Sequence, residues 1–250
     1  MKISIITVVK NDKKNLLSTI KSVLSQNHKN FEYIIWDGVS SDGTRSAVKP
    51  YLNKYIKYFC KKDKNYYEGL NRAIQVASGD YIGILNAGDK YFNPETLKKV
   101  SQKCLSAKCD LLFGDLIFVN NKNEHVRTWN YPIKKLNIFS SLKIASPTLF
   151  VKKKIAKSFS YNTDYNISSD TDFNIRISKK NFNFIYLDQV LILMKTGGLS
   201  TNYLLFFKKM SEDFSILKSH YGIFFVLIYL YKVFFKITSF KFFKKNIYNY

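Results

Sequence analysis

The sequence predicts an α/β protein with a mostly parallel central sheet flanked by helices and with a helical, amphipathic C-terminal tail. Short apolar runs alternate with helical patterns through the first 110 residues, an order that favours parallel strands joined by right-handed crossovers. Hairpin-like runs follow, and aromatic and aliphatic runs with interspersed lysines fill residues 203–250. Because no Gly-, Ser- or Pro-rich linker interrupts residues 1–202, we expect one domain with two halves, 1–110 and 111–202.

Four short β-branched or aromatic runs in the first half are expected to be strands. They cover residues 3–9, 31–37, 56–60 and 80–86. Helices are expected between and after them, where apolar residues recur three and four positions apart. Asn11-Asp12 can cap the first helix. The last covers residues 93–107, with Asn93 as its cap and Pro94 in its first turn, where a missing N–H costs little.

The second half is expected to add antiparallel strands to the sheet. Residues 110–120 and 124–131 flank Asn-Lys-Asn and predict a hairpin. A strand over 147–151, a helix over 169–180 and a strand pair near 183–195 are expected to follow.

The net charge of +22 draws the protein toward polyanions such as nucleic acid, anionic lipid or phosphorylated substrates. Part of this charge is explained by composition alone, since abundant Lys, Asn, Ile, Tyr and Phe are typical of an AT-rich genome. A nucleic-acid-binding protein is the minor alternative, because 18 tyrosines could stack on bases. The lysines are scattered and no recognised nucleic-acid motif is present, so we expect no nucleic-acid partner.

The cysteines and histidines indicate neither disulfides nor a metal centre. The cysteines form no CxxC pair, and the N-terminus lacks the pattern of an export signal, which favours a reduced, cytoplasmic location. The histidines are expected at the surface rather than as metal ligands. These residues are Cys60, Cys104, Cys109, His28, His125 and His220.

The C-terminal tail is expected to lie on a membrane surface. Its uninterrupted apolar stretch, residues 223–231, is shorter than the about 20 residues that cross a bilayer. Lysines between the aromatic runs suit an interfacial helix that faces anionic headgroups. They are Lys232, Lys236, Lys241, Lys244 and Lys245. The alternative is a helix that packs on the domain's own core.

Four polar or acidic corners fall at the ends of expected strands or just beyond them, where open α/β sheets bind ligands. They are residues 36–44, 61–74, 86–89 and 168–177. Turn or cap chemistry explains each corner taken alone.

Taken together, these stretches resemble a known family. The motifs are "KISIITVVKND", "EYIIWDGVSSDGT" and "DKNYYEGLNRAIQVASGDYIGILNAGD", followed by the weaker "SPTLFVKK", "SSDTDFNIRI" and "GGLS". In this order they resemble the inverting family 2 glycosyltransferases with the Rossmann-like GT-A fold, and among them the bacterial polysaccharide enzymes. The resemblance covers residues 3 to about 202. It implies that 1–110 binds a nucleotide sugar and 111–202 binds the acceptor.

The resemblance also implies a metal site at the corner 86–89. In the family, a DxD-type corner holds a divalent cation that stabilises the diphosphate leaving group. Here Asp89 is the expected ligand of Mn²⁺ or Mg²⁺, cations that prefer oxygen ligands. Asn86 replaces one carboxylate and is expected to contact ribose or metal through its amide oxygen.

The remaining roles are likewise implied by resemblance. Asp170 is the expected general base for the acceptor hydroxyl, with Asp172 as the fallback, whereas Arg176 is more readily explained as structural. Asp37 and Asp63 are expected to contact the nucleotide. Thr7 and Asn11 are expected to line the nucleobase pocket.

The function implied is metal-dependent, inverting transfer of a sugar from a nucleotide-diphosphate sugar to a glycan or polyprenyl-linked acceptor. It belongs to bacterial surface polysaccharide synthesis, at the inner face of the cytoplasmic membrane. Ser146 stands where many relatives carry His, and Asn86 departs from the two-carboxylate pattern. A catalytically weak or inactive GT-A scaffold is therefore the alternative.

Overall fold

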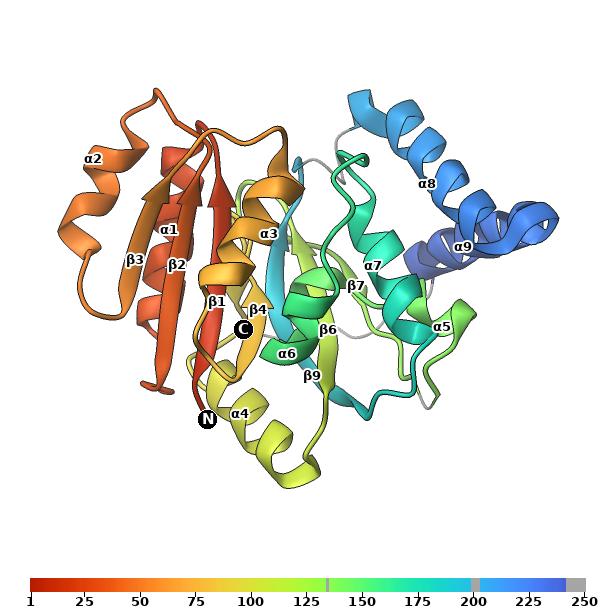
Figure 1. Cartoon of the computed structure of the whole chain (residues 1–250), viewed down its shortest axis with the longest axis horizontal. Helices are drawn as coiled ribbons and strands as arrows, with labels where there is room; N and C mark the ends of the chain where they lie inside the picture. Colours follow the sequence, from red (N-terminus) through yellow and green to blue (C-terminus); the bar gives the residue numbers. More distant parts are fainter. Residues whose placement is uncertain (134, 199–202, 242–250) are drawn as a thin grey trace.

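The computed structural model describes residues 1–133, 135–198 and 203–241 (Figure 1). The strands are β1 (Ile3–Val9), β2 (Phe31–Asp37), β3 (Ile56–Cys60), β4 (Tyr81–Ile84), β5 (Lys90–Tyr91), β6 (Leu111–Val119), β7 (His125–Trp129), β8 (Phe150–Lys152) and β9 (Phe184–Lys195). Within the described residues they form one sheet in the order β3-β2-β1-β4-β8-β6-β9-β5, with β7 paired to β6.

Strand direction follows the expected change after the first half. The first four strands are all parallel, through the pairs β1–β2, β1–β4 and β2–β3. β6 and β7 form the expected antiparallel hairpin, and β8 is antiparallel to both β4 and β6. β9 runs parallel to β6 and antiparallel to the short strand β5. The four parallel strands therefore end at one edge of the sheet.

Helices cover both faces of the sheet. They are α1 (Lys13–Leu24), α2 (Thr44–Val48), α3 (Tyr66–Val76), α4 (Thr96–Ala107), α5 (Ile138–Ser141), α6 (Lys153–Ser158), α7 (Ser169–Ser178), α8 (Phe206–Tyr221) and α9 (Phe225–Lys241). The apolar residues of α1 and α4 belong to one core cluster, and those of α3, α6 and α7 belong to another. This division makes a helix–sheet–helix sandwich.

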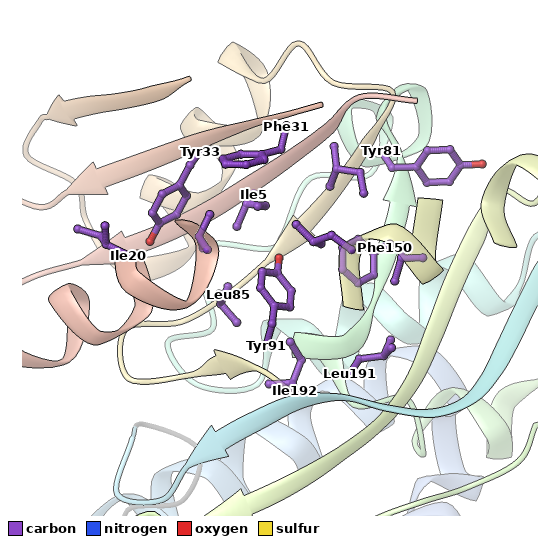
Figure 2. Close-up of a cluster of buried hydrophobic side chains, with 14 of the residues drawn as sticks. Ile5, Ile20, Phe31, Tyr33, Tyr81, Leu85, Tyr91, Phe150, Leu191 and Ile192 are labelled. Atoms are coloured by element: carbon purple, nitrogen blue, oxygen red, sulfur yellow. The ribbon is translucent and has the colours of Figure 1, made fainter. Parts of the chain in front are cut away.

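The alternation of side chains along each strand builds these two cores. Ile5 and Tyr33 pack on the α1 side, whereas Ile6 and Ile34 pack on the α3 side. Figure 2 shows the first cluster, in which side chains from the parallel strands meet others from β5, β8 and β9. Strands buried on both faces explain why the sequence reads as continuous apolar runs there.

Three expected elements differ in the structure. The strand expected over 147–151 is a 3-10 turn, η2 (Ser146–Thr148), followed by the short strand β8. The strand pair near 183–195 is a single strand, β9, whose pairing with β6 shifts register next to Gly114. A Cβ on Gly114 would lie 2.8 Å from the carbonyl oxygen of Leu187, so the two backbones approach closely there. The helix expected from 93 begins at Thr96, because the Asn93 side chain instead accepts a hydrogen bond from Glu95 N at 3.0 Å in a turn.

The described part of the tail is a helical hairpin. α8 and α9 are joined at η4 (Gly222–Phe224), where Gly222 has φ +54°, and both lie at the end of the molecule opposite β3 (Figure 1). One face of the hairpin packs on the domain, as the alternative expectation stated. The buried cluster there comprises Leu142, Ile175, Ile216, Leu217 and Ile228.

The other face of the hairpin is exposed and apolar. Ile223 is 86% exposed and Leu227 66% exposed. Within the described residues, one helical stretch, Phe206–Phe235, is long and apolar enough to cross a membrane by length and composition alone. Lys232, expected to face headgroups, instead points inward and pairs with Asp213 at 2.9 Å. Of the other tail lysines, the side chains of Lys236 and Lys241 and the whole of Lys244 and Lys245 lie outside the described residues.

Candidate active site

A cavity of about 720 Å³ opens where the four parallel strands end. Its walls come from the segments that follow β1, β2, β3 and β4, from the start of α7 and from the end of β9. Carboxylates that line it include Asp12, Asp63, Asp89 and Asp170. Segments far apart in the sequence thus reach one space, as expected at this edge of an α/β sheet.

The corner after β4 is a tight turn closed by a hydrogen bond of 3.0 Å from Asp89 N to Asn86 O. Gly88 occupies its third position with φ +95°, as in a type II turn, a conformation that glycine adopts at little cost. Thr19 of α1 holds the turn, because its hydroxyl accepts from Gly88 N at 2.9 Å and donates to Asp89 O at 2.9 Å. The strand therefore stops in a geometry that places Asp89 at the cavity.

Asp89 is a buried carboxylate, 2% exposed, whose described partners are neutral donors. One oxygen accepts from Lys195 N at 3.0 Å and the other from Asn86 Nδ2 at 3.3 Å. Burial raises the pKa of Asp89 to about 7, although these bonds oppose the shift. A cation at this carboxylate would supply the charge that the neutral donors do not.

Tyr66 connects the metal corner with α7. Asn65 caps α3 by accepting from Glu68 N at 3.1 Å, which places Tyr66 in the first turn beside the cavity. The Tyr66 hydroxyl donates to Asn86 Oδ1 at 2.6 Å. Burial, followed by the charges of Asp89 and Asp170, raises the pKa of Tyr66. Both carboxylates therefore lie close enough to act on this one phenol.

Asp170 lies in the first turn of α7 and lines the cavity. Its Oδ2 accepts from the Ser146 hydroxyl at 3.2 Å, and its Oδ1 accepts from Thr171 N at 2.8 Å. The Tyr67 hydroxyl donates to Ile167 O at 2.8 Å and so ties the preceding segment to α3. The structure brings Asp170 and Asp89 into the same cavity, as the sequence predicted.

Asp172, the fallback base, is not at the cavity. Its carboxylate accepts from Arg176 Nε at 2.8 Å and from His220 Nε2 at 2.7 Å. Burial opposes ionisation, yet these two partners hold the pKa of Asp172 below its usual value. Asp172 stabilises α7 from within an ion-pair cluster, and its fallback role as base stays a prediction. His220, which was expected at the surface, is a partly buried member of that cluster. Arg176 is structural here.

The loops after β1 and β2 support each other beside the cavity. Asn11 has φ +53° and accepts from Ser41 N at 2.8 Å, while its own N donates to Ser40 Oγ at 2.8 Å. Asn tolerates this left-handed conformation through local hydrogen bonds of this kind. Asn11 therefore shapes the loop and is not among the residues that line the cavity.

Asp37 ends β2 and is fully buried. Its carboxylate accepts from Ser40 N at 2.8 Å and from the Tyr58 hydroxyl. The neighbouring Gly38, rather than Asp37, lines the cavity. Thr7 is also fully buried, bonded to Tyr33 and to the carbonyl of Leu85. In this structure Asp37 and Thr7 support the strands beneath the site, and their expected contacts with a nucleotide stay predictions.

Asp63, in contrast, lines the cavity as expected. Its Oδ2 accepts from Trp36 Nε1 at 2.8 Å and its Oδ1 pairs with Arg72 at 2.9 Å. A Cβ on Gly69 would lie 3.1 Å from this carboxylate, so the helix backbone packs directly against it. Asp63 is therefore held rigidly at the wall of the cavity.

Sequence analysis missed the cations of the site. Lys10, Lys64 and Lys195 line the cavity with the carboxylates. Lys195 Nζ donates to Asn15 Oδ1 at 2.8 Å, close to the metal corner that its own backbone N contacts. Lys195 comes just before the weak "GGLS" motif, which was the only signal for it; part of that motif, 199–200, lies outside the described residues.

The divalent cation implied by resemblance fits as a site shared with a diphosphate. Asp89 offers a buried carboxylate with neutral partners, and Asn86 offers an amide oxygen. Among the residues that the structure describes, no three His, Cys, Asp or Glu side chains gather into an all-protein site. Mg²⁺ commonly binds through one or two carboxylates together with substrate phosphates. The donor set present here suits that mode.

Comparison with known proteins agrees with this geometry. The family model for glycosyl transferase family 2 matches residues 4–166. The chain belongs to this family. An uncharacterized glycosyltransferase of Methanocaldococcus jannaschii is 27% identical to this family member over 93% of the chain and 85% of that protein. A PGL/p-HBAD biosynthesis glycosyltransferase of Mycobacterium bovis is 26% identical over 64% of the chain and 63% of that protein.

Solved structures share the fold. S. aureus TarS 1–349 in complex with UDP-GlcNAc has a TM-score of 0.72 at 19% identity and covers 98% of this chain, which spans 74% of that one. The mannosyltransferase PcManGT from Pyrobaculum calidifontis, in complex with GDP-Man and Mn²⁺, has a TM-score of 0.63 at 14% identity, over 86% of this chain and 61% of that one. The expected GT-A fold is confirmed.

Proposed function

We propose that this family 2 glycosyltransferase uses Mn²⁺ or Mg²⁺ to transfer a sugar, with inversion, from a nucleotide-diphosphate sugar to a glycan or polyprenyl-linked acceptor. The observation that carries the proposal is that Asp89 and Asp170, from segments about 80 residues apart, line one cavity together with Tyr66. The finer role is in bacterial surface polysaccharide synthesis, as the resemblance of the sequence motifs implies. Residues 1–110 supply the donor side and 111–202 the acceptor side.

The chemistry assigns one task to each side of the cavity. The acceptor hydroxyl transfers its proton to Asp170, and the hydroxyl oxygen forms a bond to the anomeric carbon of the donor sugar. At the same time, the bond between that carbon and the diphosphate oxygen breaks. Negative charge then builds on the diphosphate. Lys195 and Lys10 provide fixed positive charge toward it, and a cation held by Asp89 and Asn86 would stabilise it further.

Nucleotide binding tests the donor side. At least one of UDP, GDP and dTDP should raise the melting temperature of the protein, and Mn²⁺ added with that nucleotide should raise it further. The reason is that a ligand that binds only the native state stabilises that state. If none of the three shifts melting with or without metal, the transferase proposal is wrong. Tight nucleotide binding without transfer to any lipid-linked acceptor would favour the scaffold.

We further propose that the hairpin holds the enzyme on the inner face of the cytoplasmic membrane. Its outward residues include Ile223, Phe224, Leu227, Leu230 and Phe234, all more than half exposed. An apolar surface of this kind on a basic chain suits an anionic lipid surface.

Vesicle flotation tests this contact. The double variant Phe224→Ser/Leu227→Ser should lose most binding to vesicles that contain anionic lipid. The matched control is Leu105→Ser, because Leu105 is 58% exposed on α4, outside the hairpin. Equal flotation of both variants would argue against the hairpin as the contact.

A further inference from the structure

The hairpin also bonds to the segment that carries the proposed base. Glu212 of α8 accepts hydrogen bonds from three successive backbone amides: Asn166 N at 2.9 Å, Ile167 N at 2.8 Å and Ser168 N at 2.9 Å. Asp170 follows two residues later. One carboxylate from the tail therefore fixes the chain immediately before α7, where charge-assisted bonds are strong.

Two lysines of the hairpin reach the start of α7 itself. Lys209 Nζ donates to Ser168 Oγ at 3.2 Å, and Lys232 Nζ donates to Thr171 Oγ1 at 3.3 Å. Both pair with Asp213, at 4.0 and 2.9 Å. Thus two half-buried ammonium groups share one carboxylate beneath the first turn of α7.

Asp170 is within electrostatic reach of this cluster. Burial lowers the pKa of Lys232, whereas the charges of Asp213 and Asp170 raise it. Burial raises the pKa of three phenols near Asp170, those of Tyr66, Tyr67 and Tyr161, and the charge of Asp170 adds to the shift. Lys232 of α9 therefore brings a cation to the start of α7, where Asp170 also accepts from the Ser146 hydroxyl.

Packing alone does not require these polar bonds. The hairpin already buries Ile216, Leu217 and Ile228 against the domain. Burying charged groups costs free energy because they lose their hydration. Apolar side chains in their place would stabilise the packing of the hairpin on the domain equally well. The polar contacts instead gather on the residues that precede and follow Asp170.

We propose that the tail is part of the active site: Glu212 and Lys232 are positioning residues that fix Asp170 in the cavity, and Lys232 places a positive charge beside the residue that follows it. This inference rests on the proposed role of Asp170 as the base. The tail then has two faces with two tasks, an apolar one directed outward and a polar one directed at α7. Removing the tail would impair the chemistry, in addition to any loss of membrane contact.

The first test compares Glu212→Gln with Glu95→Gln. The side-chain amide of glutamine has one oxygen and one NH₂ group, and the NH₂ group cannot accept from a backbone N–H. Some of the hydrogen bonds from residues 166–168 to Glu212, which we call the clamp, are therefore lost. We expect kcat to fall about tenfold or more for Glu212→Gln while nucleotide affinity stays within about twofold, since the donor side is separate. Glu95→Gln should leave both unchanged, because Glu95 is a half-exposed residue just before α4 and does not line the cavity. Equal kcat for both variants would overturn the clamp.

The second test compares Lys232→Met with Lys232→Arg. Without the cation, the acidic limb of the kcat–pH profile should move up by about half a unit or more, because an opposite charge favours the carboxylate. Lys232→Arg should restore the wild-type profile. A 13C NMR titration of the Asp170 carboxyl reads the same shift without turnover. An unmoved Asp170 titration in Lys232→Met would overturn the electrostatic part.

Folding and function are separated by controls. Lys232→Met leaves Asp213 with one weaker partner, so Lys232→Met/Asp213→Asn serves as a variant with both charges removed, and it should show the same pH shift. Unchanged nucleotide binding reports that each variant is folded. If the wild type binds no nucleotide yet the Asp170 titration moves as expected, the proposed function fails and the positioning inference stands.

Discussion

The corner 86–89 and the segment 166–172 each present a carboxylate to the same cavity, but they are held in different ways. The corner is held by its own turn, by Thr19 of the adjoining helix and by Lys195. The segment is held by groups from the tail, above all Glu212. The difference teaches that the metal side is built mainly by the strand–turn–helix core, whereas the base side depends on an element added after it.

The largest effect should come from the metal side. Asp89→Asn removes the buried carboxylate of the metal corner. The loss of several kcal/mol of charge stabilisation should lower kcat/KM by about 10⁴-fold. Radiolabelled sugar transfer measures it. Asp110→Asn is the control, since Asp110 pairs with Lys152 at the opposite end of the strands. Full activity of Asp89→Asn would remove the metal corner from the mechanism.

A change at the proposed base should lower kcat by about 10³-fold. Asp170→Asn removes the proton acceptor and lowers kcat accordingly, with nucleotide affinity nearly unchanged. Asp172→Asn is the matched comparison on the same helix: it breaks the pairs with Arg176 and His220 and should cost about 1–3 kcal/mol of folding stability, but retain most activity. The opposite ranking in kcat would return the base role to Asp172.

The two sides also differ in how far sequence predicted them. The parallel strands, their order of appearance and the corner residue Asp89 follow from local patterns and resemblance, because each rests on nearby residues. Glu212 and Lys232 carry no local signal, since their partners lie tens of residues away in sequence. Asp37 ends its strand as expected and Thr7 lies near the end of its own, but which way their side chains point depends on Tyr58 and Tyr33 from neighbouring strands.

A smaller effect is the pH dependence of the metal side. With the pKa of Asp89 raised to about 7 from 3.8, the native carboxyl keeps its proton over a range where the unfolded one loses it. Without cation, stability should therefore fall as pH rises from about 4 to about 7, and level off above. Cation binding requires the ionised form, so affinity for Mn²⁺ should rise about tenfold between about pH 6 and pH 8.

Calorimetric titration with a nucleotide-diphosphate sugar measures this dependence. The sugar ester is used because the terminal phosphate of a free nucleotide titrates near pH 6 itself. Asp89→Asn should abolish the pH dependence along with most of the affinity. A wild-type affinity that stays flat over this range would mean that Asp89 is ionised before the cation binds.

The smallest effect is expected for a change in the support of the metal corner. It shows whether the turn 86–89 keeps its shape without the hydrogen bonds with Thr19. Thr19→Val keeps the shape of the side chain but leaves Gly88 N–H without its partner, at a cost of about 1–3 kcal/mol in stability. Affinity for Mn²⁺ with nucleotide should fall only several-fold, because the turn bond from Asp89 N to Asn86 O remains. Thr128→Val on β7 also deletes a buried hydroxyl, bonded to His125, and should leave metal affinity unchanged. If Thr19→Val instead matched the loss in Asp89→Asn, the corner would have no stability of its own, and both sides of the cavity would depend on distant support.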